Sequence, residues 1–127
     1  MNRSEKGKLG EDVCAWYLEK HGYSVVARNV HSRYGEVDLI AENADFVCFV
    51  EVKTRKAGAP VSPAEAVDRR KQQKLVLTAQ HYLMTNETAK QPRFDVFEVL
   101  LNGEGRPEKV RLIEHAFDAS CIDNLYY

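Results

Sequence analysis

Three charged residues interrupt the most apolar part of the sequence, and their types suit phosphodiester chemistry. Asp38 lies within GEVDLIAE, and Glu51 and Lys53 lie within FVCFVEVK. Two neighbouring carboxylates repel each other unless a positive charge lies between them. A divalent cation such as Mg²⁺ supplies that charge, because it binds through one or two carboxylates, water and phosphate oxygens. Such an ion activates a water molecule and polarises a phosphodiester, while a nearby lysine orients the water or offsets charge on the phosphate.

A hairpin between the two segments would bring the carboxylates together. The intervening residues 43–45, NAD, are typical of a turn. If the turn places Asp38 opposite Glu51, their Cβ atoms lie about 4.5–5.5 Å apart and point the same way. Lys53 shares the face of Glu51, because alternate residues of a strand point to the same side. A shift of the register by one residue would instead move Asp38 to the other face.

A structural salt bridge at the margin of the sheet is the alternative interpretation. An aspartate followed at a distance by Glu-x-Lys arises often by chance, so this spacing alone favours the salt bridge. Glu11 adds weight to a metal site, because it precedes Cys14 and Leu18 at helical spacing and lies at the edge of an apolar arc. Its other interpretation is an exposed acid near a helix N-terminus, stabilised by the helix dipole.

Positive charge is concentrated between residues 53 and 74, where seven Lys or Arg accompany two acids, although the whole chain has a net charge of −1. Lys71 interrupts the apolar stripe of a predicted helix and Lys74 follows it, so both would face a phosphate backbone near the site. The alternative is a solvated helix face, on which the lysine stems lie along the sheet and the amines stay in water. The candidate nucleic-acid contacts are Lys71, Lys74, Arg55 and Lys56.

The elements that must position these residues follow the order α-β-β-β-α-β-β, which predicts a mixed β-sheet flanked by helices. Apolar residues at positions 9, 13, 16 and 17 predict a first helix from Ser4 to about Lys20. Gly22 fits the left-handed residue that follows such a helix. Strands are predicted at residues 23–30, 35–42, 46–53, 93–101 and 109–117.

The second helix is predicted from Pro63 to about Thr85. Ser62 suits the N-cap, Pro63 suits the first helical position, and Glu65 can close a capping box. This helix would carry Lys71 and Lys74 towards the sheet.

The chain of 127 residues suits a single domain, residues 1–127, with one core. No apolar run approaches the roughly 18 residues typical of a membrane span. The N-terminal MNRSEKGKLG lacks the apolar region of a signal peptide. We therefore expect a soluble, cytoplasmic protein without membrane partners. Cysteines at positions 14, 48 and 121 are widely spaced without a CxxC motif, which predicts reduced, mostly buried thiols.

Six segments of the chain together resemble the PD-(D/E)XK nuclease superfamily, also called restriction-endonuclease-like. They are GKLGE (7–11), RN (28–29), GEVDLIA (35–41), FVEVKTR (49–55), AVDRRK (66–71) and RFDV (93–96). GEVDLIA and FVEVKTR are specific as a pair, whereas either alone is weaker. Over this range the chain looks most like the YraN-like family of bacterial proteins.

The resemblance implies an α/β, restriction-endonuclease-like fold similar to that of archaeal Holliday-junction resolvases. It implies that Asp38 and Glu51 bind Mg²⁺ or Mn²⁺, that Lys53 serves the attacking water, and that Glu11 completes the metal site. Glu36, two residues before Asp38, is a secondary candidate. The loop KAGAPVSPAEAV (56–67) differs from the family pattern, which bears on substrate access. Junction resolvases act as dimers, because a symmetric substrate needs two cuts, so the resemblance is compatible with a homodimer.

Three hypotheses about function follow. The leading one is a Mg²⁺-dependent endonuclease that hydrolyses phosphodiester bonds in DNA, including branched or structured DNA. The alternative is a nucleic-acid-binding protein that has the nuclease fold without catalytic activity, and the third is an interaction protein whose charges form salt bridges. Retention of Asp38, Glu51 and Lys53 favours the first over the second. The near-neutral net charge weighs against tight, unassisted DNA binding.

Overall fold

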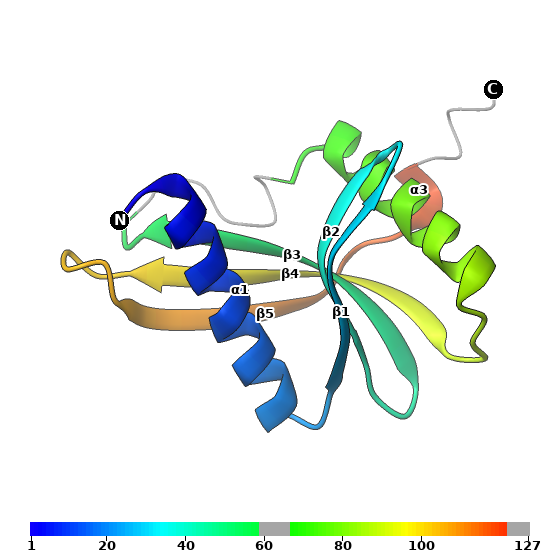
Figure 1. Cartoon of the computed structure of the whole chain (residues 1–127), viewed down its shortest axis with the longest axis horizontal. Helices are drawn as coiled ribbons and strands as arrows, with labels where there is room; N and C mark the ends of the chain where they lie inside the picture. Colours follow the sequence, from blue (N-terminus) through cyan, green and yellow to red (C-terminus); the bar gives the residue numbers. More distant parts are fainter. Residues whose placement is uncertain (59–66, 122–127) are drawn as a thin grey trace.

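The structure, a computed structural model, describes residues 1–58 and 67–121. Its described elements are α1 (Arg3–Lys20), β1 (Ser24–Ser32), β2 (Gly35–Glu42), β3 (Phe46–Lys56), α3 (Arg69–Thr85), β4 (Gln91–Leu101) and β5 (Pro107–Phe117). They form a mixed α/β fold and confirm the predicted order α-β-β-β-α-β-β (Figure 1).

The five strands form one sheet in the order β1-β2-β3-β4-β5. Neighbouring strands are antiparallel except β3 and β4, which are parallel and are separated along the chain by α3. The predicted hairpin between β2 and β3 is present, and Asn43 Oδ1 closes it by accepting hydrogen bonds from the backbone N–H groups of Asp45 and Phe46. In Figure 1 the β1–β2 hairpin runs steeply, whereas β3, β4 and β5 run across the view, so the sheet is strongly twisted.

The two described helices cover opposite faces of the sheet, and β3 supports both. Cys48 and Val50 pack in the apolar cluster under α1, whereas Val47 and Phe49 pack in the cluster under α3. This alternation follows from the period of two along a strand. Because both faces of β3 are covered, its sequence is a nearly continuous apolar run, which makes Glu51 conspicuous within it.

Both small and large side chains bury α1 against the sheet. Its buried residues are Gly10, Cys14, Ala15 and Leu18, while Trp16 is 59% exposed. The apolar spacing therefore located the helix and most of its packed face, because Leu9, Val13 and Tyr17 pack against the core cluster, whereas Trp16 does not. The helix ends where Gly22 follows with a φ of +87°, which confirms the predicted left-handed residue.

The second described helix, α3, begins later than the sequence predicts. Its first residue is Arg69, and its N-cap is Asp68, whose side chain accepts a hydrogen bond from the backbone N–H of Lys71 at 2.9 Å. The prediction of a continuous helix from Pro63 was wrong, because Asp68 has extended backbone angles (φ −69°, ψ 170°). The predicted capping box at residues 62–65 lies outside the described residues.

The remaining boundaries differ little from the predictions. β1 continues to Ser32 and β5 begins at Pro107, each two residues beyond its predicted limit. The cysteines at positions 14, 48 and 121 are buried thiols, as predicted. Neither described helix has the length and apolar character needed to cross a membrane.

Candidate active site

The strands β2 and β3 separate beside Asp38, which places this residue in a fork of the sheet. At this end of the hairpin, the last pair of the β2–β3 ladder is Leu39 opposite Val50. One more step in that register would pair Asp38 with Glu51. Instead, the Asp38 carboxylate accepts a hydrogen bond from the backbone N–H of Val52 at 2.8 Å. The register is therefore the one that brings the two carboxylates to the same point of the sheet.

A kink shared by β1 and β2 sets the direction of Asp38. Val37 packs in the cluster under α3 and Leu39 in the cluster under α1, although residues two apart in a regular strand share a face. On either side of this point Arg28 pairs with Leu39 and Val30 with Val37. The same register places Asn29 of β1 opposite Asp38. The φ of Asn29 is 51°, in the left-handed region that asparagine tolerates better than most residues. The alternation of side chains thus breaks at Asp38, where the sheet opens.

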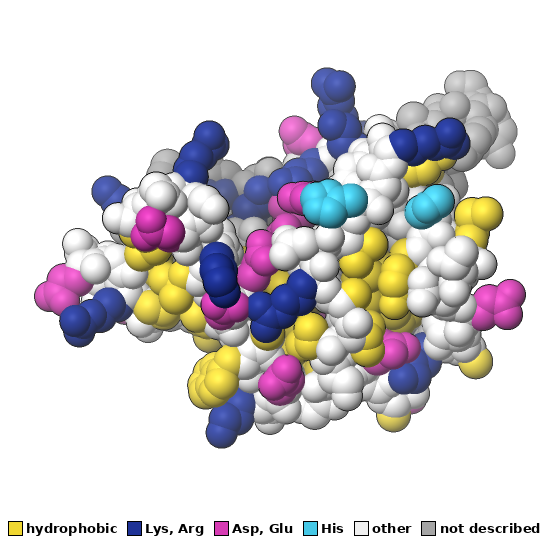
Figure 2. All heavy atoms as spheres, viewed as in Figure 1, with side chains coloured by type: hydrophobic (Ala, Val, Ile, Leu, Met, Phe, Trp, Pro, Cys, Tyr) yellow, Lys and Arg dark blue, Asp and Glu magenta, His cyan; other side chains and the backbone are white. Residues whose placement is uncertain are grey.

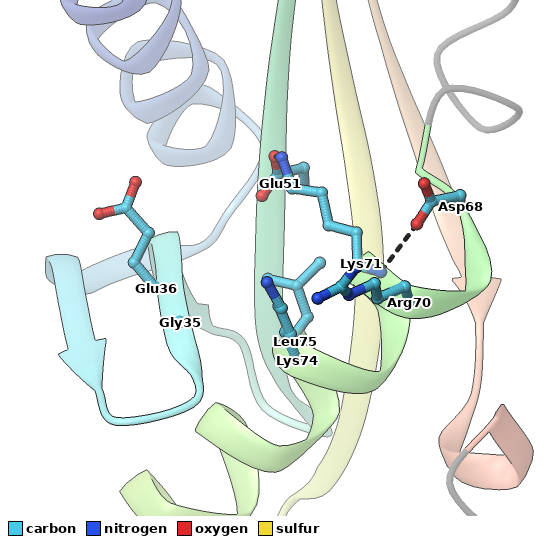
Figure 3. A pocket seen from close by; sticks show the side chains of 8 residues that line it. All are labelled: Gly35, Glu36, Glu51, Asp68, Arg70, Lys71, Lys74 and Leu75. Atoms are coloured by element: carbon cyan, nitrogen blue, oxygen red, sulfur yellow. Dashed lines mark hydrogen bonds and ion pairs between the residues drawn. The ribbon is translucent and has the colours of Figure 1, made fainter.

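Glu51 is a buried carboxylate that contacts two lysines. Its exposed fraction is 5%. The Nζ atoms of Lys53 and Lys71 lie 3.5 Å and 2.5 Å from its Oε1 atom. Figure 3 shows the long side chain of Lys71 extending from α3 to the carboxylate of Glu51. The sequence predicts Lys71 only as a flanking contact to nucleic acid, whereas the structure places its ammonium inside the site.

The surroundings shift the pKa values of these groups. Burial, together with the charges of Glu51 and Glu11, raises the pKa of Asp38 to about 7. Burial also lowers the pKa of Lys53, and the adjacent ammonium of Lys71 lowers it further. Burial opposes the charged form of Lys71, but the ion pair with Glu51 outweighs burial and raises the pKa of Lys71. Near neutral pH, the carboxyl of Asp38 is therefore partly protonated.

A glycine brings Glu11 of α1 close to the fork. A Cβ atom at Gly10 would overlap Thr54 Oγ1 of β3 and would lie 3.1 Å from Val52 Cγ1, so only glycine lets α1 approach β3 this closely. Glu11 is the next residue, and its charge contributes to the raised pKa of Asp38. Glu11 also lines a hollow of about 550 Å³ between the start of α1 and β1.

The fork opens into a cleft of about 500 Å³ between α3 and the start of β2. Its lining residues are Gly35, Glu36, Glu51, Asp68, Arg70, Lys71, Lys74 and Leu75. Figure 3 shows Gly35 and Glu36 on one side and the basic side chains of α3 on the other. The structure thus brings Lys71 and Lys74 to the same cleft as Glu51, with Glu36 on the opposite wall, where its carboxylate lies 3.3 Å from His31 Nδ1.

Two predicted contacts lie elsewhere. Lys56, at the end of β3, is exposed and lines a different hollow beside the β4–β5 turn. Arg55 is half-buried and does not line the cleft that contains Glu51. Three basic residues lie near the end of β3: Lys53, Arg55 and Lys56. Of these, only Lys53 contacts Glu51 among the described residues.

Sequence reasoning did not single out Gly35, Asp68 or Arg70, which also line the cleft. Gly35 has a φ of +149°, which other residues rarely adopt, so the backbone conformation favours glycine at the start of β2, where a Cβ would make only ordinary contact with Lys74 Cβ at 3.5 Å. Arg70 could have been found, because it precedes Lys74 by four residues and shares its helix face. Asp68 was hidden by the predicted helix start, since an N-cap was not expected there.

The donor set of the fork fits a hard divalent cation. Among the described residues, the side chains of His, Cys, Asp and Glu form no group of three that could hold a metal ion. Mg²⁺ does not need such a group, because it keeps several waters and takes one or two carboxylates together with substrate phosphates. Asp38 and Glu51 supply two carboxylates close enough for one to raise the pKa of the other. Glu11 adds a third acid at the margin of this pair.

The surface around the site carries mixed charge. Figure 2 shows basic and acidic side chains interspersed across the middle of one face, without a continuous basic surface. This agrees with the net charge of −1. Attraction of a polyanion would therefore depend on local groups such as those lining the cleft rather than on the field of the whole molecule.

The fold and the cleft define a small mixed α/β protein with an acid–lysine cluster where two central strands separate. The profile of "Uncharacterised protein family UPF0102" matches residues 10–99, and the chain belongs to this family. This confirms the family-level resemblance in the sequence. The matched range includes every candidate residue from Glu11 to Lys74.

Relatives in this family align with nearly the whole chain. A UPF0102 protein of Caldanaerobacter subterraneus subsp. tengcongensis is 44% identical over 119 residues, which are 92% of this chain and 98% of the relative. A UPF0102 protein of Clostridium botulinum strain Loch Maree is 42% identical over 113 residues, covering 87% of this chain and 92% of the relative. One of Dictyoglomus thermophilum is 42% identical over 107 residues, covering 84% and 91%.

Proposed function

We propose that this protein is a Mg²⁺-dependent endonuclease of the PD-(D/E)XK superfamily that hydrolyses phosphodiester bonds in DNA, including branched or structured DNA. The observation that carries the proposal is the fork, where Asp38 and Glu51 lie one step beyond the last ladder pair and Lys53 lies 3.5 Å from Glu51. A strand-end salt bridge accounts for the lysine, but not for a second acid whose pKa is raised to about 7 beside Glu51. Acids with strongly perturbed pKa values are typical of functional sites, and Glu51, the neighbour of Asp38, lines the cleft.

The acids and Lys53 have distinct roles in this proposal. Asp38 and Glu51 would hold Mg²⁺ or Mn²⁺, with Glu11 beside them. The bound ion would polarise the phosphodiester and lower the pKa of a water molecule. Lys53 extends from the rigid central strand, so its amine holds the attacking water in a fixed direction and offsets negative charge on the phosphate.

The cations of α3 would bind the substrate backbone. Lys71, Lys74 and Arg70 line one side of the cleft, and each can neutralise a phosphate oxygen that enters it. The resemblance to Holliday-junction resolvases supports branched DNA as the substrate class. The mixed charge of the surrounding surface supports recognition of a local structural feature over tight binding to any long duplex.

A non-catalytic nucleic-acid-binding protein is the second candidate, and a specific observation favours it. Glu51 is already paired with two ammonium groups, which balance its charge without a metal. The described residues also lack a ready-made group of three metal ligands. In this alternative the cations of the cleft bind phosphate, and the acids hold those cations in place.

A cleavage panel tests the proposal. Duplex, flap, four-way junction and single-stranded DNA are incubated with the protein and Mg²⁺ or Mn²⁺. We expect cleavage of at least one substrate, loss of cleavage in EDTA, and a loss of at least about a hundredfold in rate for Asp38→Asn, Glu51→Gln and Lys53→Ala. Glu42→Gln is the matched control, because Glu42 lies on the same strand as Asp38 but pairs with Lys90; this variant should cleave normally.

The panel also separates the two candidates. Equal cleavage by wild type and Asp38→Asn would identify a contaminating nuclease and count against the proposal. Binding of a substrate without cleavage of any of them, in either metal, would support the non-catalytic candidate instead.

A further inference from the structure

Lys71 lies where the proposed metal site needs positive charge. Its Nζ atom is 2.5 Å from Glu51 Oε1, and its charge and that of Asp38 attract each other. One ammonium group thus acts on both carboxylates that would hold a divalent ion. Among the described residues, only Lys53 and Lys71 form salt bridges with Glu51.

The two lysines differ in their freedom to leave Glu51. Lys53 belongs to the central strand, and its side chain is 24% exposed. The side chain of Lys71 is 43% exposed and reaches the carboxylate from α3, along the wall of the cleft (Figure 3). Rotation about the bonds of its flexible four-carbon stem would move the ammonium into the cleft while α3 stays in place. Arg70 and Lys74 line the same cleft.

We propose that Lys71 is a displaceable internal cation, which neutralises Glu51 and Asp38 in the metal-free protein and moves to a substrate phosphate when a divalent ion binds them. The inference rests on the proposed function, because it takes Asp38 and Glu51 as the metal ligands. It accounts for charge balance at two adjacent acids, the buried Glu51 and the half-buried Asp38, when no metal is bound. It also explains why a basic residue interrupts the buried stripe of α3 at this position.

Displacement makes metal and nucleic acid cooperative. A metal ion at Glu51 releases Lys71 for phosphate, and a phosphate that holds Lys71 exposes Glu51 to metal. By linkage, each ligand must raise the affinity for the other by the same factor. In the absence of nucleic acid, Lys71 competes with the ion, so the metal affinity of the protein alone is held down.

Calorimetric titration with Mn²⁺ tests this competition in the absence of DNA. We expect Lys71→Met to bind Mn²⁺ about tenfold or more tightly than wild type, because the competing charge is removed. Lys74→Met is the matched control: it removes a lysine from the same helix and cleft that forms no salt bridge with Glu51. Its Mn²⁺ affinity should stay within about threefold of wild type, since Lys74 is exposed and its charge is screened by solvent.

Thermal unfolding supplies a second readout. In EDTA, Lys71→Met should melt below wild type, because Glu51 loses a partner. Mn²⁺ should raise its melting temperature more than that of wild type, in line with its higher affinity. Lys71→Gln, which keeps a polar side chain, replaces Lys71→Met if the latter does not fold in EDTA.

The outcomes distinguish this inference from the proposed function. If wild type binds Mn²⁺ and Asp38→Asn does not, the metal site stands. In that case, Lys71 variants that bind Mn²⁺ no more tightly than wild type overturn the displacement alone. An equal gain in Mn²⁺ affinity for Lys74→Met would also overturn the displacement, because it would show that loss of any positive charge near the site strengthens Mn²⁺ binding. If neither wild type nor the Lys71 variants bind Mn²⁺, the metal site and the displacement both fail.

Discussion

Two clusters of acids and bases lie on the same sheet, and they differ in how completely their charges are satisfied. Near the start of β4, Asp95 accepts hydrogen bonds from Arg93 Nε and Nη2 at 2.8–3.1 Å and from the backbone N–H of His115 at 3.1 Å. Arg93 also donates to the hydroxyl of Tyr23 at 2.7 Å and lies over the ring of Phe46. Arg93 is 3% exposed and Asp95 is fully buried, so this cluster is closed to water.

The cluster in the fork is open by comparison. Two lysines hold one oxygen of Glu51, both lysines are partly exposed, and Asp38 accepts a single hydrogen bond from Val52. Burial and nearby acids raise the pKa of Asp38 to about 7, whereas the hydrogen bonds that Arg93 donates to Asp95 and Tyr23 outweigh burial and raise the pKa of Arg93. A closed ion pair stabilises a fold, while an open one keeps bonding capacity for a ligand. The two clusters therefore predict opposite responses to loss of charge.

The largest effect is expected in the closed cluster. Asp95→Asn should lower the free energy of unfolding by about 3–5 kcal/mol, because it removes the buried carboxylate that pairs with Arg93 and leaves the guanidinium with only the exposed Glu114 at 3.8 Å as an acidic partner among the described residues. Urea denaturation measures this change. Glu98→Gln is the control on the same strand: its partner Arg111 is 3.8 Å away and 55% exposed, so the loss should stay below about 1 kcal/mol. A loss below 1 kcal/mol for Asp95→Asn would remove the distinction between the clusters.

The opposite sign is expected for Asp38→Asn, and its size should depend on pH. The folded pKa of Asp38, about 7, lies above the unfolded value of 3.8. The protonated carboxyl therefore favours the folded state fully below about pH 4, and this stability is lost as pH rises to about 7. Asparagine remains neutral and can still accept the hydrogen bond from Val52. The variant should match wild type near pH 4 and exceed it by about 2–4 kcal/mol at pH 8 without metal.

Unfolding curves from pH 4 to pH 8 in EDTA provide the measurement. The charged groups that act on Asp38 are Glu51, Glu11 and Lys71, and the substitution leaves all three in place. A variant less stable than wild type at pH 8 would show that Asp38 is a partner in a structural ion pair, like Asp95.

The next effect concerns the helix that brings Glu11 to the open cluster. Gly10→Ala should destabilise the protein by about 1–3 kcal/mol, because its Cβ would overlap Thr54 Oγ1. Gly7→Ala is the control in the same helix, and with no atom within 4 Å of its new Cβ it should stabilise the protein by about 1 kcal/mol. Chemical denaturation compares the two. In a Thr54→Ala background the cost of Gly10→Ala should shrink; an unchanged cost would exclude the overlap as its cause.

Much of this arrangement follows from local sequence. The hairpin could be predicted from the short turn at residues 43–45 between two apolar runs, but its register could not, because a shift by one residue fits the same runs. The acids and Lys53 were found because charges in an apolar strand are conspicuous. The role of Gly10 was not found, since glycine carries no apolar side chain and its importance lies in the close approach of α1 to β3.

The parts that were missed depend on contacts distant in the sequence. The kink at Asn29 and Asp38 involves two strands, so neither strand predicts it alone. Lys71 was expected beside the site, but its contact with Glu51 depends on how α3 lies across the sheet. The start of α3 was wrong because Ser62 and Pro63 suit a helix as well as Asp68 does, and local propensity cannot choose between them.

The smallest effect is expected at the rim of the open cluster. Lys74 lines the cleft and has no salt-bridge partner among the described residues, so its charge is available to a phosphate. Lys74→Ala should reduce the slope of log K against log salt by about one, because one counterion fewer is released. Fluorescence anisotropy with labelled DNA, in EDTA to prevent cleavage, measures the slope.

Lys109→Ala is the control for this measurement, because Lys109 lines a different hollow, beside Trp16. It removes the same charge from the same molecule, so a field effect of net charge would change both slopes equally. A change confined to Lys74 would mean that nucleic acid enters the cleft where Glu51 lies. If neither slope changes, the cations of α3 belong with Arg93 as structural charges, and the open cluster loses its proposed substrate. The salt dependence of DNA binding thus tests whether the open cluster, which has fewer hydrogen bonds than the closed one, also differs from it in binding a ligand.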